Sequence, residues 1–112
     1  MPISKLEFVN HCKVDHAERW RIMREVTDNN LGEIICTVEA RDNRWGCLTS
    51  TGVYAIVNHD FTTLITAYLP SYERVRQMYK QLGQRIPQAV RDMVNINLYK
   101  ESLLNGGNFC YA

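Results

Sequence analysis

The chain has 112 residues, of which 46% are hydrophobic and 22% are charged, and its formal net charge is +1. This length and composition predict one soluble domain, residues 1–112, whose core needs neither disulfides nor metal. The near-zero charge excludes a strong overall field for nucleic acid or membranes. Nine of the thirteen basic residues are nevertheless arginine, which pairs with phosphate and carboxylate through a planar fork.

Two helices are predicted at the N-terminus. Ser4 and Glu7 form a capping box, so a short helix should run to about Cys12. Asp15 and Glu18 form a second capping box, which opens a helix that extends through about Val26. Its core-facing stripe recurs every third residue, at Ala17, Trp20, Met23 and Val26.

Strands are predicted in the middle of the chain, where β-branched and apolar residues alternate with turn residues. Residues 33–40 should form a strand and 41–46 a turn. Residues 47–51 should form either a short strand or an irregular segment that leads into the next strand. Two further strands, 52–58 and 62–69, should flank the polar break His59-Asp60-Phe61 as a hairpin.

Two further helices are predicted in the C-terminal part of the chain. Ser71 should start a helix that Gly83 ends, and Pro87 suits the first turn of a helix that runs to about residue 104. The predicted fold class is therefore α+β, with N-terminal helices, an antiparallel meander of three to four strands and C-terminal helices. We expect the helices to pack on one face of the sheet.

The four cysteines are Cys12, Cys36, Cys47 and Cys110, and no two of them form a CxxC pair. A structural zinc site usually needs such close pairs, so free buried thiols are the expected state. No apolar run reaches the ~18 residues of a membrane span, and the first residues lack signal-peptide architecture. We therefore expect a soluble, unprocessed protein that acts in the cytoplasm.

Two histidines flank the break between the N-terminal helices. His11 and His16 are candidate proton carriers, and Arg19 shares one helix edge with His16. The alternative is that each histidine makes a local hydrogen bond at a helix end. A metal site at His11, Cys12 and His16 is disfavoured, because adjacent helical residues point apart, so we expect no metal and no cofactor. His59, in the predicted turn, should have a local role only.

Thr66 and Tyr68 stand near the end of the last predicted strand. Strict alternation puts them on one face with Leu64, beside Tyr54, Ile56 or Asn58 of the paired strand, and puts Ile65, Ala67 and Leu69 on the other. Both residue types are good strand formers, which is one explanation for their presence. The other is a polar cleft in which their hydroxyls hydrogen-bond a phosphate.

The segments "DHAERW" on an early helix and "LITAYLPS" at the end of the meander resemble small ribonuclease toxins of the barnase/EndoU/colicin/RelE-like group. This group includes toxin domains of contact-dependent inhibition systems and related phage and plasmid proteins. The matching positions are His16, Arg19, Thr66 and Tyr68. A leucine separates Tyr68 from Pro70, which departs from the pattern of the group.

The resemblance implies a metal-independent endoribonuclease that cleaves RNA by attack of a ribose 2′-hydroxyl on the adjacent phosphodiester. His16 would act as base or acid, His11 as the second proton carrier, Arg19 as the phosphate clamp, and Thr66 and Tyr68 as donors. The implied partners are RNA and a tight inhibitor, either an antitoxin or an immunity protein. If the chain were part of a larger secreted toxin, it would reach the cytoplasm from another cell.

A second interpretation comes from a different class of protein. The near-zero net charge and the apolar meander also suit a small interaction protein, such as an immunity protein or a phage-encoded inhibitor of a host macromolecule. An exposed strand edge in such a protein would extend the sheet of its partner.

Overall fold

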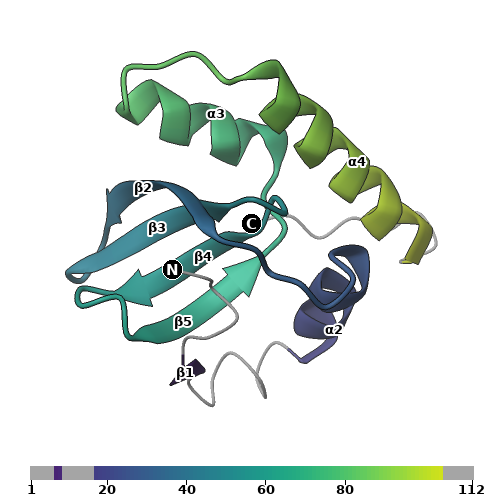
Figure 1. Ribbon diagram of the computed structural model, residues 1–112, viewed down its shortest axis with the longest axis horizontal. Coiled ribbons are helices and arrows are strands. Elements are labelled where there is room, and N and C mark those ends of the chain that lie inside the picture. Colours follow the sequence, from purple (N-terminus) through teal and green to yellow (C-terminus); the bar gives the residue numbers. More distant parts are fainter. Residues whose placement is uncertain (1–6, 9–16, 105–112) are drawn as a thin grey trace.

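The computed structural model describes residues 7–8 and 17–104, in which the chain forms five strands and three helices (Figure 1). The strands are β1 (Glu7–Phe8), β2 (Ile34–Ala40), β3 (Arg44–Thr49), β4 (Tyr54–Asn58) and β5 (Thr63–Tyr68), and the helices are α2 (Ala17–Val26), α3 (Tyr72–Gln81) and α4 (Gln88–Leu104). The α+β class is confirmed, as is the order of helix, meander and C-terminal helices.

The sheet has the strand order β1-β5-β4-β3-β2. Strands β2 to β5 form an antiparallel meander in which each strand pairs with the next along the chain. Strand β1 pairs in parallel with β5, so that Glu7 lies opposite Thr63. The predicted short helix from Ser4 to Cys12 is therefore wrong at residues 7–8, where backbone pairing with β5 replaces the local helix; its other residues lie outside the described part of the chain.

The two faces of the sheet bury two separate hydrophobic clusters. Cys47, Ala55 and Ala67 pair across neighbouring strands on one face and pack with Ile22, Met23 and Val26 of α2. On the other face, Leu48, Tyr54 and Tyr68 pack with residues of α3 and α4. The expectation that all helices cover one face is wrong, because the strands carry apolar side chains on both faces and each face requires a cover. Figure 1 shows α3 and α2 on different sides of the sheet.

The turn between β2 and β3 is shorter than predicted. It comprises residues 41–43, and Arg44 already pairs with Ala40. Asp42 and Asn43 both adopt the left-handed conformation, with φ of 59° and 60°, which these two residue types tolerate better than most. Arg44, Trp45 and Gly46, predicted as turn, therefore belong to β3.

A register shift in β5 reverses the predicted position of Leu64. Thr66 pairs with Ile56, but the next β4 residue, Val57, pairs with Leu64, so β5 has one extra residue at this point. Such a β-bulge moves the following side chains to the opposite face. Leu64 is fully buried on the α2 side with Ala67, whereas strict alternation placed it beside Tyr68.

One side-chain hydrogen bond caps the start of α3, and another joins α4 to the loop between β3 and β4. Ser71 caps α3 by accepting a hydrogen bond from the backbone N–H of Arg74 at 3.1 Å. The buried Asn97 of α4 donates to the carbonyl oxygen of Thr51 at 2.8 Å. A Cβ at Gly52, whose φ is +89°, would collide with that amide.

Within the described residues, no helix has both the length and the apolar character to cross a membrane.

Cys36 and Cys47 are free thiols, as expected, whereas Cys12 and Cys110 lie outside the described residues. Burial raises the pKa of Cys47 to about 12 and also raises the pKa of Cys36. Both thiols are therefore protonated at neutral pH, and they act as small packing groups, not as nucleophiles.

Candidate functional site

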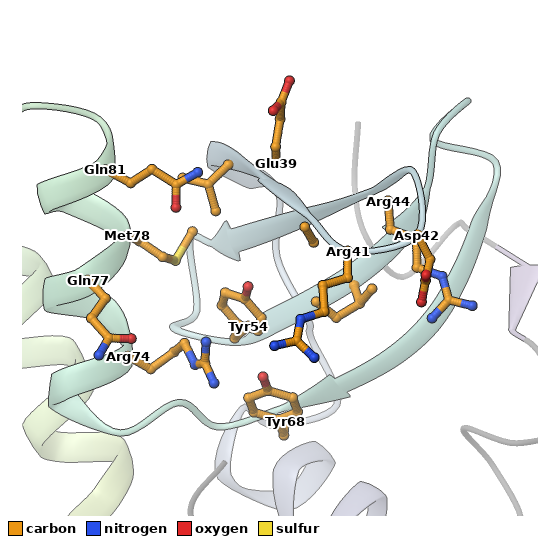
Figure 2. Close-up of a pocket in the computed structure, with 13 residues that line it drawn as sticks. Glu39, Arg41, Asp42, Arg44, Tyr54, Tyr68, Arg74, Gln77, Met78 and Gln81 are labelled. Atoms are coloured by element: carbon orange, nitrogen blue, oxygen red, sulfur yellow. The ribbon is translucent and has the colours of Figure 1, made fainter.

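A cavity of about 610 Å³ opens between the Tyr54 face of the sheet, the β2–β3 turn and α3 (Figure 2). The sheet supplies its floor, the turn supplies one wall and α3 supplies the opposite wall. The residues that line it are Val38, Glu39, Ala40, Arg41, Asp42, Arg44, Tyr54, Ile56, Tyr68, Arg74, Gln77, Met78 and Gln81.

Two tyrosines form the centre of the floor. Tyr54 and Tyr68 are register partners on β4 and β5, and their rings stack with centroids 5.3 Å apart and planes at 29°. Both residues are at least nine-tenths buried. Gly46, on the neighbouring strand, lies under the Tyr54 phenol, and a Cβ at that position would overlap the hydroxyl. The glycine therefore gives the Tyr54 ring the space to lie across β3.

An arginine from a different helix covers each of these rings. The Cζ atom of Arg74, on α3, lies 5.7 Å from the Tyr54 ring centroid, and that of Arg19, on α2, lies 5.0 Å from the Tyr68 ring centroid. These distances are within the range of cation–π attraction. The stacked tyrosines thus connect two helices that pack on different faces of the sheet.

Three arginines line the cavity, namely Arg41, Arg44 and Arg74. None of them forms a salt bridge with a carboxylate of the described residues. Arg21 and Arg76, by contrast, form salt bridges with glutamates on their own helices at distances of 2.7–2.9 Å. Arg74 also has a buried Nε atom without a hydrogen-bond partner. A buried donor without a partner costs free energy, so this guanidinium is suited to an anion that the protein itself does not supply.

The two tyrosine hydroxyls are proton donors at neutral pH. Burial is the largest influence on both groups and raises the pKa of each. The positive charge of Arg74 opposes this effect at both hydroxyls but does not reverse it. A protonated phenol donates a hydrogen bond to an anion, and it does not serve as a general base.

Of the predicted site residues, the structure brings Arg19 and Tyr68 into contact. Thr66 lies on the same face as Tyr68, opposite Ile56, but it does not line the cavity. His11 and His16 lie outside the described residues, so their roles stay predictions.

The sequence pattern does not single out the arginines that line the cavity. It predicts Arg74 only as part of the start of a helix, and Arg41 and Arg44 only as parts of a turn. The capping serine, Ser71, is the signal that fixes Arg74 in the first turn of α3. Leu69 and Pro70, which lead from β5 toward that turn, are buried, and the turn holds Arg74 over the Tyr54 ring.

A buried carboxyl group on α4 interacts electrostatically with Arg19. Glu101 of α4 is 6% exposed, and its Oε1 atom has no hydrogen-bond partner. Burial raises the pKa of Glu101, while the charge of Arg19 lowers it in part. Glu101 and Arg19 therefore interact electrostatically across the packing of α4 on α2. In residues 7–8 and 17–104, no three histidine, cysteine, aspartate or glutamate side chains cluster as a metal site requires.

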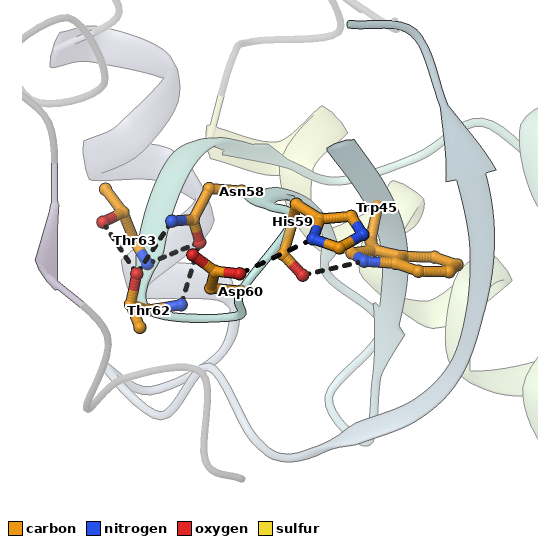
Figure 3. A network of polar contacts seen from close by, with 6 residues as sticks. All are labelled: Trp45, Asn58, His59, Asp60, Thr62 and Thr63. Atoms are coloured by element: carbon orange, nitrogen blue, oxygen red, sulfur yellow. Dashed lines mark hydrogen bonds and ion pairs between the residues drawn. The ribbon is translucent and has the colours of Figure 1, made fainter. Parts of the chain in front are cut away.

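The hairpin that carries His59 is held by contacts to its neighbours (Figure 3). The indole N–H of Trp45 donates to the backbone oxygen of His59 at 3.1 Å, and the two rings stack with centroids 6.2 Å apart. Nδ1 of His59 lies 3.5 Å from a carboxylate oxygen of Asp60. Asn58 closes the turn by accepting from the backbone N–H groups of Thr62 and Thr63.

Replacing His59 by alanine should change any nuclease activity by only a few-fold. The substitution removes an exposed ring but keeps the backbone oxygen that accepts the Trp45 hydrogen bond. Rates of RNA cleavage by the folded variant and the wild type test this expectation. A loss of a hundredfold or more would place the active site at this hairpin and not at the tyrosine pair.

Comparison of the chain with protein-family models, with curated proteins and with solved structures found no match.

Proposed function

We propose that this protein is a metal-independent endoribonuclease, a toxin that cleaves RNA in the cytoplasm of a bacterium. The observation that carries the proposal is the buried, unpartnered Nε of Arg74 beside two protonated tyrosine hydroxyls in one cavity. Such a set of donors stabilises the negative charge that builds on a phosphodiester during cleavage. The sequence features that resemble small ribonuclease toxins support the same class of reaction.

The proposed reaction begins with His16, which takes the proton from a ribose 2′-hydroxyl. The 2′-oxygen then attacks the adjacent phosphorus, the bond to the 5′-oxygen of the next nucleotide breaks, and His11 donates a proton to that leaving oxygen. Arg74 and the hydroxyl of Tyr68 donate to the phosphoryl oxygens, and Arg19 clamps the phosphate from the Tyr68 side. Thr66, which lies on the Tyr68 face but outside the cavity lining, is proposed as a further donor to RNA that extends beyond the cavity.

RNA cleavage by the purified protein should be unaffected by EDTA, because no step above uses a metal ion. A substrate with a single 2′-deoxyribose at the cleavage site should resist cleavage at that bond, since the attacking hydroxyl is absent. The products should carry 2′,3′-cyclic phosphate ends. Loss of activity in EDTA, with recovery on addition of one divalent ion, would contradict the metal-free mechanism.

The experiment needs a control for contaminating nucleases. His16→Ala, purified in parallel, should lose about a hundred- to ten-thousandfold in rate, because that is the usual contribution of proton transfer. A folded His16→Ala variant with the full rate would show that the cleavage comes from elsewhere.

The proposed toxin has an inhibitor protein as its partner in the producing cell. An inhibitor with acidic side chains would complement the three arginines that line the cavity, Arg41, Arg44 and Arg74. Expression in bacteria should therefore arrest growth unless the inhibitor is co-expressed.

A second candidate function, that of a non-enzymatic interaction protein, is favoured by apolar surface away from the cavity. On α4, Ile96, Tyr99 and Leu103 are 53%, 67% and 65% exposed and follow one another at helical spacing. Ile35, on the edge strand β2, is 47% exposed. If Arg74→Ala and His16→Ala arrest growth as strongly as the wild type, this second function replaces the first.

A further inference from the structure

The cavity is larger than a single phosphate requires. Its volume of about 610 Å³ falls in the middle of the range, about 300–1,000 Å³, that holds whole small molecules. The arginines and tyrosines occupy only part of its lining. The remaining wall, formed by α3, carries side chains of different chemistry.

The α3 wall changes from a cation to amides along the helix axis. Arg74, Gln77, Met78 and Gln81 all line the cavity and lie at the i, i+3, i+4 and i+7 positions of one helix face. At 1.5 Å per residue, the stripe from Arg74 to Gln81 is about 10 Å long, comparable with the length of a nucleotide. Figure 2 shows Arg74 beside the tyrosines and Gln81 at the opposite end of this wall.

The amide end also has an apolar surface. Met78 is buried on α3, and Val38 on β2 lines the same cavity. A thioether and a branched aliphatic side chain pack well against the flat face of a heteroaromatic ring. Gln77 and Gln81 are both exposed, and Gln81 lies at the end of this wall that is farther from Arg74 (Figure 2). Gln81 is therefore the amide best placed for a base whose phosphate lies at Arg74.

We propose that this end of the cavity is a nucleobase subsite that selects adenine, with Gln81 as the reading residue. The proposal rests on the proposed function, because the phosphate of the same nucleotide would lie at Arg74 and the tyrosines. One glutamine amide offers a donor and an acceptor side by side, which match N7 and N6–H₂ of adenine. Guanine presents two acceptors on that edge and is matched by an arginine fork instead.

The test measures the affinity of the intact protein for each of the four nucleoside 3′-monophosphates and for inorganic phosphate by isothermal titration calorimetry. Adenosine 3′-monophosphate should bind at least about tenfold more tightly than the other nucleotides and than phosphate, since one good bidentate base contact is worth about 1–3 kcal/mol. Gln81→Ala should remove this preference and leave the affinity for inorganic phosphate unchanged.

Gln84→Ala is the matched control, because Gln84 is also exposed but lies beyond α3 and outside the cavity lining. It should bind all five ligands as the wild type does. Equal affinities for the four nucleotides, or a preference that survives in Gln81→Ala, would overturn the adenine subsite while leaving the ribonuclease proposal intact. Failure of the wild type to bind any nucleotide or phosphate would overturn the adenine subsite. RNA cleavage assays then decide the ribonuclease proposal separately: cleavage would support it, and absence of cleavage would overturn it as well.

Discussion

Replacing Arg74 by alanine should lower kcat/KM for RNA cleavage by about a hundred- to a thousandfold, the usual cost of removing one preorganised donor to a transition-state anion. The buried Nε of this residue has no partner in the protein, so its hydrogen-bonding capacity is reserved for a ligand. The substitution also removes the cation that lies over the Tyr54 ring. Initial rates on a short RNA of defined sequence, together with thermal melting of the variant, make the measurement.

Arg76→Ala is the matched control, on the same helix two residues later. Arg76 is exposed and forms a salt bridge with Glu73 at 2.9 Å, so its loss should leave the rate within a few-fold. Arg74→Lys should recover only part of the activity, because lysine keeps the charge but not the planar fork. A folded Arg74→Ala variant with wild-type activity would show that the cavity is not the active site.

Leu64→Ala should lower the free energy of unfolding by about 2–5 kcal/mol, the range measured when a buried leucine is truncated. Leu64 is 0% exposed and packs with Ala55, Val57 and Ala67 on the α2 side of the sheet. The substitution leaves a cavity that the paired strands cannot close. Urea denaturation curves of the variant and the wild type give the difference directly.

The neighbouring Ile65→Ala provides a test of the bulge. Ile65 is only partly buried, at the point where β5 has its extra residue, so its truncation should cost about 1 kcal/mol, near the average for point substitutions. Strict alternation would place Ile65, not Leu64, on the face with Ala67. A larger loss for Ile65→Ala than for Leu64→Ala would therefore contradict the register of β5.

The last two predicted strands and the C-terminal helices agree with the structure because each carries its own local signal. Ser71 and Pro87 mark helix starts, and the β-branched runs around 54–58 and 63–68 have strand periodicity. The guanidinium of Arg19 lies over the Tyr68 ring, and the roles of these two residues in a phosphate-binding cleft stay predictions.

Other features depend on contacts that a single sequence does not display. Whether Leu64 faces α2 depends on a bulge, and a bulge adds one residue without a characteristic sequence signal. The cavity depends on the packing of α3 against the sheet, which sets Arg74 over Tyr54 from a position twenty residues away in the chain. The space for that ring depends in turn on Gly46, which the sequence suggested only as part of a turn.

The order of the strands has a consequence for synthesis on the ribosome. Each hairpin of the meander joins neighbouring segments, so β2 to β5 form contacts of low sequence separation as soon as they emerge, and such contacts form fastest. The stacked tyrosines belong to this meander, whereas Arg74 joins them only when α3, which follows β5 in the chain, docks on the sheet. A nascent chain that ends before α3 therefore carries the tyrosine floor of the cavity without the Arg74 side chain.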